Sequence, residues 1–146
     1  MSIAVLGGTG PQGRGLALRW AVAGEQIVIG SRDPQRAASV ARELGHGITG
    51  TGNVEAAHDA DVILVAVPYE GHAALITQIA STVAGKVLID CVNPLGFDKQ
   101  GAFALSVPEG SAAQQAAALA PQARVVAAFH HISAVLLQDL QEQLDI

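Results

Sequence analysis

A glycine-rich loop near the start of the chain has the spacing of a phosphate-binding turn. Residues 7–13, Gly-Gly-Thr-Gly-Pro-Gln-Gly, contain the pattern Gly8-x-Gly10-x-x-Gly13 between an apolar run and a helical stretch. In dinucleotide-binding folds the first glycine permits a tight turn, the second lets the backbone approach the pyrophosphate, and the third lets the helix pack on the strand. Free N–H groups and the dipole at the helix start then favour the diphosphate. The loop therefore predicts a dinucleotide site.

The residues Ser31 and Arg32 stand where the choice between NAD and NADP is made. Enzymes that use NAD place Asp or Glu at the end of the second strand, about 20 residues past the glycines, to hold the ribose 2′-hydroxyl. A hydroxyl and a guanidinium suit a 2′-phosphate instead, because Arg forms bidentate, charge-assisted hydrogen bonds with phosphate oxygens. Arg36 and Thr9 can approach the same phosphate, whereas Asp33 is explained as the N-cap of the next helix. The predicted cofactor is NADP(H).

Other chemistry finds little support in the sequence. The loop also matches Gly7-x-x-Gly10-x-x-Gly13, the spacing of short-chain reductases, but those enzymes usually need a Tyr-x-x-x-Lys pair. The single tyrosine, Tyr69, has Ala73 four residues further on. We find no catalytic triad, no zinc-ligand spacing and no paired carboxylate site, so we expect no metal and no side-chain nucleophile.

The elements that must position these residues alternate along the whole chain, which is the pattern of βαβ units and a parallel sheet. The expected strands are residues 3–6, 26–30, 47–50, 62–67, 86–90 and 124–129. The expected helices are residues 12–23, 33–45, 53–58 (with Asn53 as its cap), 71–84, 111–120 (capped by Ser111) and 133–144. Six strands with crossover helices fit the doubly wound order 3-2-1-4-5-6 of a Rossmann-type α/β fold. We expect a single NADP-binding domain over residues 1–146.

Composition and charge restrict the class of protein. Half of the residues are apolar but only 3% are aromatic, so small and branched side chains must form the core, as suits a sheet covered on both faces. The net charge of −5 argues against binding to nucleic acid or to an anionic membrane. Neither a signal peptide nor a membrane span is predicted, and the single cysteine, Cys91, is expected in the core after Asp90, which is expected to bond the loop backbone. These features predict a cytoplasmic protein.

Several short motifs occur in combination along the chain. They are Gly7-Gly8-Thr9-Gly10, Ser31-Arg32, Val67-Pro68, and the Val-Val-x-Ala-x-His run that ends at His130. Together they resemble the NADPH-dependent coenzyme F420 reductases, also called F420H2:NADP oxidoreductases. Residues 90–96 and 108–113 resemble the actinobacterial branch of that family, and the resemblance covers essentially the whole chain.

The resemblance implies an oxidoreductase that transfers a hydride directly between C4 of the nicotinamide and C5 of the deazaflavin coenzyme F420. The two cofactors carry the chemistry, and the protein supplies position and water exclusion. By motif, the 2′-phosphate is held by Thr9, Ser31, Arg32 and Arg36. The rest of NADP(H) is contacted by Gly8, Gly10, Pro11, Gln12, Gly13, Val67, Pro68, Tyr69 and backbone near Ala134. His130 is expected to line the deazaflavin site, and no residue is assigned as a certain catalytic group.

The chain departs from the family pattern in two motifs and in length. Tyr69 stands where the archaeal pattern has Trp, and residues 130–133, His-His-Ile-Ser, stand where it has His-Thr-Ile-Pro. The resemblance implies that members continue for a further segment that contributes to the deazaflavin pocket and to subunit contacts. We therefore expect this chain to lack a C-terminal portion of the family.

An apolar face on the last expected helix bears on assembly. Val135, Leu136, Leu140 and Leu144 are expected to lie on it uncovered, and mean hydropathy is positive. We therefore expect a chain that binds NADPH and self-associates as a homodimer. It is expected to transfer hydride to F420 at less than roughly a hundredth of the rate of a longer homologue.

Two other functions stay open on the sequence. The same scaffold can serve an NADP-dependent reductase of another small substrate, because fold does not fix function. It can also serve a non-catalytic NADP-binding module. A deazaflavin hydride-transfer assay separates the two enzymes, and tight NADPH binding without turnover of any acceptor would support the binding module.

Overall fold

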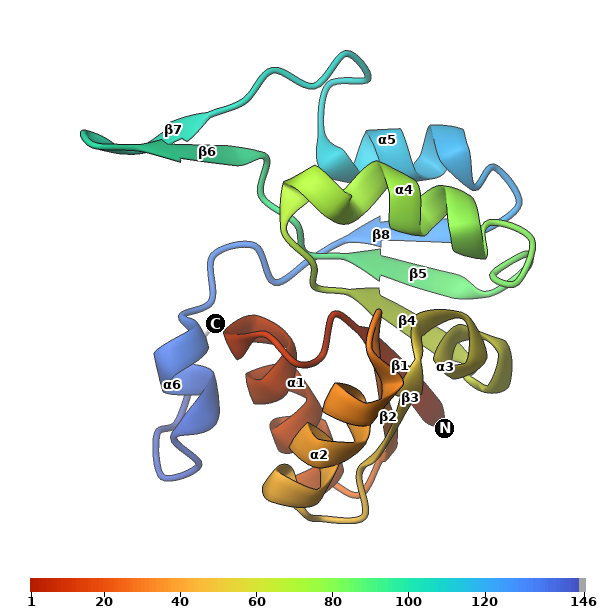
Figure 1. Ribbon diagram of the computed structural model, residues 1–146, viewed down its shortest axis with the longest axis vertical. Helices are drawn as coiled ribbons and strands as arrows, with labels where there is room; N and C mark the ends of the chain where they lie inside the picture. The colour runs from red at the N-terminus through yellow and green to blue at the C-terminus, as the bar shows by residue number, and fades with distance from the viewer. Residues whose placement is uncertain (145–146) are drawn as a thin grey trace.

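A parallel sheet lies between two layers of helices in the computed structural model, which describes residues 1–144 (Figure 1). Its strands are β1 (Ser2–Leu6), β2 (Gln26–Ser31), β3 (Thr49–Gly52), β4 (Val62–Val65), β5 (Val87–Asp90) and β8 (Arg124–Ala127). They are ordered β3-β2-β1-β4-β5-β8, and all neighbours are parallel. The predicted doubly wound order is confirmed, with β8 as the sixth strand.

The helices cover the two faces of the sheet separately. The first face is covered by α1 (Pro11–Val22), α2 (Pro34–Leu44) and α6 (Ala134–Gln138), and the second by α3 (Asn53–Asp59), α4 (Tyr69–Ile79) and α5 (Ala112–Leu119). Alternate residues of each strand enter the two cores: Val5 packs with α1 and α2, whereas Ala4 and Leu6 pack with α3 and α4. Both cores are built almost entirely from Ala, Val, Leu and Ile, as composition predicted.

Two of the three predicted helix caps are confirmed. The Asp33 carboxylate accepts hydrogen bonds from the N–H groups of Gln35 and Arg36 at 3.0 and 3.2 Å, and Ser111 Oγ accepts from the Gln114 N–H at 3.2 Å. The third prediction, that Asn53 caps α3, is wrong. Strand β3 continues to Gly52, which is the N-cap, so Asn53 is already inside the helix and its side chain lies against Gly30.

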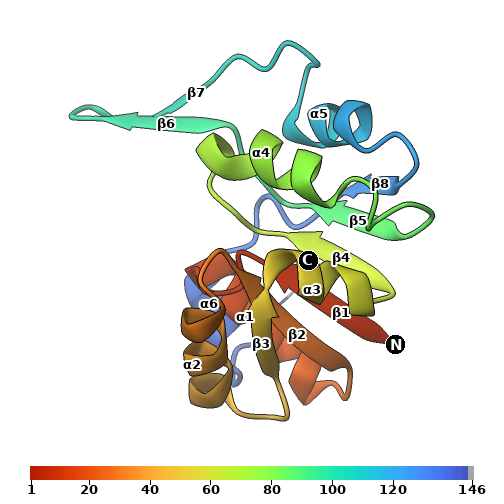
Figure 2. The same cartoon turned by 45° about the vertical axis from the view of Figure 1, so that its right-hand side comes forward.

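An antiparallel hairpin between β5 and α5 was not predicted. It consists of β6 (Leu95–Asp98) and β7 (Gly101–Ala104), with Lys99 and Gln100 at the turn. The hairpin projects from the body of the molecule, as both ribbon views show (Figures 1 and 2), and Phe97 at its surface is 76% exposed. Its strands contain glycine and alanine, which have low β-propensity, and they are largely exposed, so neither propensity nor an apolar pattern predicts them. The turn and the pairing between the two strands stabilise the hairpin.

The last helix is shorter than predicted. Helix α6 ends at Gln138 instead of residue 144, and its buried side chain is Leu137, which is 2% exposed and packs on Gly15 of α1. The Arg19 guanidinium explains the early end, because it donates to the carbonyl groups of Leu136, Leu137, Asp139 and Glu142 at 2.6–3.0 Å. Val135, Leu136 and Leu140 are exposed as expected, whereas Leu144 is half-buried against the core.

No helix within residues 1–144 has the length and apolar character needed to cross a membrane.

Candidate functional site

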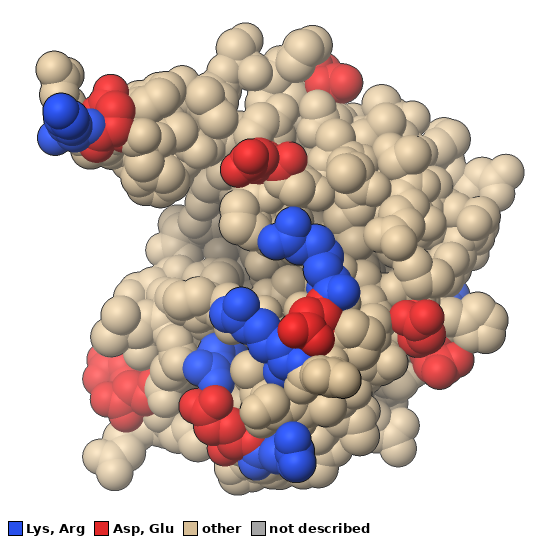
Figure 3. All heavy atoms as spheres, viewed as in Figure 1, with Lys and Arg blue, Asp and Glu red and all other residues tan. Residues whose placement is uncertain are grey.

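A cleft of about 260 Å³ lies at the carboxyl edge of the sheet, between β1, β4 and β5. In doubly wound sheets the strand order reverses at such a point, and ligands bind in the crevice outside the carboxyl ends of the strands. The space-filling view shows an indentation between the projecting hairpin and the region of α1 and α6 (Figure 3). The cleft is lined by the three segments Gly10-Pro11-Gln12, Ala66-Val67-Pro68 and Cys91-Val92-Asn93. The cleft is thus lined by five of the residues predicted to contact NADP(H): Gly10, Pro11, Gln12, Val67 and Pro68.

A larger hollow of about 500 Å³ lies near the opposite edge, around the amino ends of β1 and β2 and beside β3. It is lined by Glu25, Glu55 and Asp59 among others, which repel phosphate. We therefore place the functional site at the carboxyl edge, where the glycine loop and the helix start converge.

The glycines of the loop have different structural duties. Gly7 has a φ of +75°, so the tight turn depends on Gly7 rather than on Gly8 as predicted. A Cβ at Gly8 would lie 2.7 Å from Ile29, and one at Gly13 would lie 2.7 Å from the Gly8 Cα. Both glycines are therefore required for close packing. A Cβ at Gly10 would meet nothing nearer than the Gly7 carbonyl at 3.5 Å, so the protein leaves room there on the side of the cleft.

The start of α1 supplies donors for an anion. Gly10 is the N-cap and has no side chain, and Pro11 occupies the first helical position without an N–H group. The N–H groups of Gln12 and Gly13 donate to no group among residues 1–144. Two free donors at a helix N-terminus next to an open glycine fit a diphosphate.

The end of β2 is basic and carries no free acid within the described residues. Ser31 is buried and its Oγ accepts a hydrogen bond from the Asp33 N–H at 3.2 Å, which leaves the hydroxyl proton available. Arg32 and Arg36 are exposed and form no ion pair among residues 1–144. The Asp33 carboxylate is engaged as the N-cap of α2. In Figure 3 most of the Lys and Arg side chains in view lie over the region of α1 and α2, with Asp and Glu side chains among them. These features fit a 2′-phosphate.

The segment after β8 is held over the mouth of the cleft by two amides. Gln12 Nε2 donates to the Phe129 carbonyl at 3.2 Å, and Asn93 Nδ2 donates to the His130 carbonyl at 2.9 Å. Phe129 adopts a φ of +66°, a strained conformation for a bulky residue, and packs edge-on against Trp20 at a centroid distance of 5.8 Å. Half-buried His130 therefore lies beside the cleft, and the Gln12 side chain contacts this segment in the structure.

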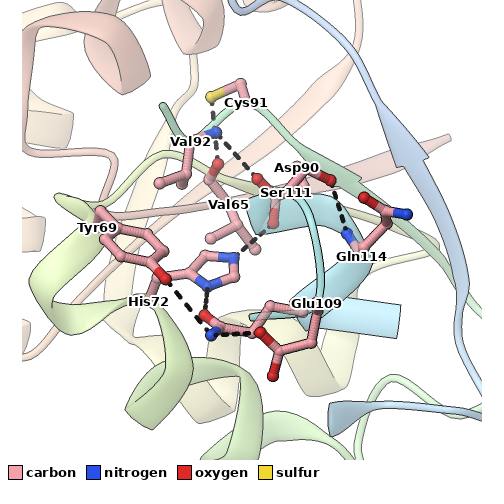
Figure 4. A network of polar contacts seen from close by, with 10 residues as sticks. Val65, Tyr69, His72, Asp90, Cys91, Val92, Glu109, Ser111 and Gln114 are labelled. Carbon is pink, nitrogen blue, oxygen red and sulfur yellow. Dashed lines mark hydrogen bonds and ion pairs between the residues drawn. The ribbon is translucent and has the colours of Figure 1, made fainter. Parts of the chain in front are cut away.

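A buried polar network behind the cleft was missed from the sequence (Figure 4). Asp90 and His72 are both fully buried, and the distance from Asp90 Oδ2 to His72 Nε2 is 2.5 Å. The other Asp90 oxygen accepts from the Val92 N–H at 2.9 Å, which confirms that Asp90 bonds the loop backbone. Tyr69, which was predicted to contact the cofactor, stacks on the His72 ring at a centroid distance of 6.0 Å. An acid at the end of a buried strand was the available sequence signal.

The thiol of Cys91 is a core group, as predicted. It is buried, and Sγ donates to the Val65 carbonyl at 3.1 Å. Burial, with a further contribution from the Asp90 charge, raises the pKa of the Cys91 thiol to about 12. The thiol therefore stays protonated and unreactive near neutral pH.

The fold and this edge define an NAD(P)-binding domain of the Rossmann type. The model of the family described as NADP oxidoreductase, coenzyme F420-dependent, matches residues 2–94. The chain is 40% identical over 156 aligned positions to the F420-dependent NADP reductase of Methanothermobacter marburgensis, covering 99% of this chain and 70% of that protein. It is 34% identical to the reductase of the same name from Methanocaldococcus jannaschii, covering 99% of this chain and 70% of that protein. The chain belongs to this F420-dependent family, as its motifs predicted.

Solved structures agree on the fold. A hypothetical protein from Sinorhizobium meliloti superposes with a TM-score of 0.78 at 28% identity. The match covers 94% of this chain and 65% of that chain.

Proposed function

We propose that this chain transfers a hydride between NADP(H) and coenzyme F420. The observation that carries the proposal is the end of β2, where Arg32 and Arg36 are exposed without an ion-pair partner among residues 1–144 and the neighbouring Asp33 is occupied as a cap. An NAD enzyme would present an acid to the ribose at this position. The family's shared description supplies the second cofactor.

We assign different parts of NADP(H) to the ends of different strands. We assign the pyrophosphate to residues 8–13, where the free N–H groups of Gln12 and Gly13 and the room at Gly10 lie. We assign the 2′-phosphate to Thr9, Ser31, Arg32 and Arg36. The nicotinamide half would then enter the cleft along residues 67–69, which follow β4 directly, toward Cys91-Val92-Asn93, with backbone near Ala134 on the far side.

The protein's contribution to the reaction is position and exclusion of water. When bound, the nicotinamide and the deazaflavin supply the hydride donor and acceptor carbons themselves. The chain holds the cleft walls: buried Val92 forms an apolar surface, and Gln12 and Asn93 hold the segment that places His130 at the mouth. A fixed cleft favours reaction because it reduces the entropic cost of aligning two rings.

The test is a coupled pair of measurements on this chain. Calorimetric titration measures NADPH and NADH affinity, and the loss of deazaflavin absorbance under NADPH measures hydride transfer. Turnover of F420 with NADPH supports the proposal. Tight NADPH binding with turnover of another acceptor, or of none, would contradict it.

We also propose a cytoplasmic protein with a single NADP-binding domain over residues 1–146 that self-associates as a homodimer. Exposed apolar side chains support self-association: Phe97 and Phe103 on the hairpin, Val126 on the edge strand β8, and Val135 on α6. Sedimentation at several concentrations tests it, and a monodisperse monomer at the highest concentration would contradict it.

A further inference from the structure

His72 and Asp90 form a buried pair that no cofactor contact explains. Asp90 is the last residue of β5, and His72 lies on α4, one turn into the helix that follows β4. Figure 4 shows the imidazole ring turned toward Asp90, with Tyr69 on one side of it and Glu109 beyond. Burial of an acid is costly unless it is paired and hydrogen-bonded, so His72 offsets the cost of burying Asp90.

The hydrogen bonds around the ring indicate its charge. The Gln115 amide nitrogen lies 3.3 Å from the Glu109 carboxylate and 3.5 Å from the Tyr69 hydroxyl, which leaves the amide oxygen 3.1 Å from His72 Nδ1. Asp90 faces Nε2. Both ring nitrogens therefore face acceptors, and only the doubly protonated imidazolium can donate to both.

The electrostatics agree with this geometry. Burial opposes the charged ring, but the hydrogen bond and the charge of Asp90, together with the bond to Gln115, outweigh it and raise the pKa of His72. The titratable groups that face this ring are Asp90 from β5, Tyr69 from its own helix, and Glu109 through Gln115. The neighbouring Cys91 thiol is neutral, so the pair is flanked by no second cation.

The second Asp90 oxygen connects the pair to the cleft. It accepts from the Val92 N–H at 2.9 Å, and this bond fixes the turn that follows β5. Residues Cys91, Val92 and Asn93 in that turn form one wall of the cleft. The Asn93 amide in turn holds the carbonyl of His130 at 2.9 Å. The His72–Asp90 pair thus supports both the cleft wall at residues 91–93 and, through Asn93, the segment at the mouth of the cleft.

We propose that His72 and Asp90 are a positioning pair for hydride transfer: the imidazolium holds the Asp90 carboxylate, which fixes the Val92–Asn93 wall of the cleft that would receive the nicotinamide. This inference rests on the proposed function. The glycine loop and Arg32 lie on other elements, so the pair acts on the alignment of the rings and leaves the anchoring of NADP(H) intact. A wall displaced by about 1 Å can cost on the order of a hundredfold in rate.

The test compares His72→Leu, which removes both donors, with His72→Gln, whose amide N–H can replace the donor to Asp90. The matched control is His58→Leu, which removes the ring from the exposed contact between His58 and Asp59. Three quantities are measured: kcat with F420, the Kd for NADPH, and the rate of hydrogen exchange of the Val92 amide. For His72→Leu we expect at least a roughly tenfold fall in kcat, faster Val92 exchange and a Kd within about twofold of the parent. His72→Gln should recover most of both losses, and His58→Leu should match the parent.

The pH profile supplies a readout that a purely structural role would not change. In the parent, kcat should fall as the pH rises through the His72 pKa, and His72→Gln should lack that fall. If His72→Leu does not fold, His72→Gln and the parent profile still decide the question. Parent-like kcat in His72→Leu, equal losses of kcat and NADPH affinity, or no recovery in His72→Gln would overturn the inference. A parent without F420 turnover contradicts the proposed function instead, and Val92 exchange then decides whether the pair fixes the wall.

Discussion

The two halves of the sheet position their carboxyl edges by different means. Around β1 and β2 the backbone forms this edge: Gly7 turns the chain, a Cβ at Gly8 would meet Ile29, and a Cβ at Gly13 would meet the Gly8 Cα. Around β4 and β5 buried side chains form the edge, because Asp90 accepts a hydrogen bond from the Val92 N–H in the following turn and is itself paired with His72. A backbone anchor suits the diphosphate, which NAD and NADP have in common, whereas the side-chain network sets the orientation of the cleft wall formed by residues 91–93.

The halves also differ in how completely they are covered. The strands β1 and β2 are covered by α1 and α2 on one face and by α3 on the other. Strand β8 is covered by α5 on one face, but Val126 on its other face is 46% exposed. The strands of the nucleotide half are therefore covered on both faces, whereas the second half presents apolar surface on which another layer can pack.

The largest effect is expected from Gly13→Val, which strikes the backbone anchor where it is most crowded. A Cβ at this position would lie 2.7 Å from the Gly8 Cα, and backbone cannot give way as a flexible side chain can. We expect a loss of about 3 kcal/mol or more in the free energy of unfolding, and loss of NADPH binding with it. Denaturant unfolding followed by circular dichroism checks this, and parent-like stability would show that α1 does not pack on the loop as described.

Gly10→Val should separate binding from folding. A Cβ at this position meets no atom closer than 3.5 Å, so the fold should tolerate it, while the branched side chain fills the space assigned to the pyrophosphate. We expect NADPH affinity to fall by about a hundredfold, which corresponds to about 2.7 kcal/mol, with an unchanged circular dichroism spectrum. Calorimetry gives the affinity, and full affinity in a folded variant would refute the loop assignment.

Arg32→Ala tests the charged part of the same edge. The parent should bind NADPH at least about tenfold more tightly than NADH, because about 1.4 kcal/mol suffices for that ratio and a phosphate–guanidinium contact can supply it. The variant should lose most of this preference and keep its NADH affinity. Arg42→Ala on the same helix layer is the control, because Arg42 lies in the last turn of α2. Equal affinities of the parent for the two cofactors would contradict the NADP assignment.

The smallest effect is the pH dependence that His72 imposes on stability. Its pKa is raised in the folded chain above the ordinary value of 6.5, so the folded state binds the proton more tightly than the unfolded state. The stabilisation is fully present below pH 6.5 and is lost as the pH rises through the folded-state pKa. Unfolding measured at a series of pH values below 9.0, the ordinary value for a thiol, avoids titration of Cys91. The parent should lose stability relative to His72→Gln across this window, and parallel curves would contradict the assignment of an imidazolium.

The sequence alone was sufficient for the strand order. Apolar runs separated by helical stretches predicted the doubly wound sheet, and the glycine spacing and Ser31-Arg32 predicted where phosphates would bind. The caps at Asp33 and Ser111 were also predictable, because a cap is a contact between residues two or three positions apart. Such signals lie within one element and its flanking residues, so they can be recognised without knowledge of the rest of the fold.

Only the tertiary structure decided the features that join distant segments. Helix α6 ends where it does because Arg19, more than a hundred residues earlier, takes its carbonyl groups. His72 and Asp90 meet because α4 returns the chain over β5. Gly7, with a φ of +75°, makes the turn, while Gly8 lies against Ile29 of the neighbouring strand. The physical reason is common to all three. Periodicity and capping are local and repeat along the chain, whereas a buried polar pair or a close backbone approach depends on which elements become neighbours.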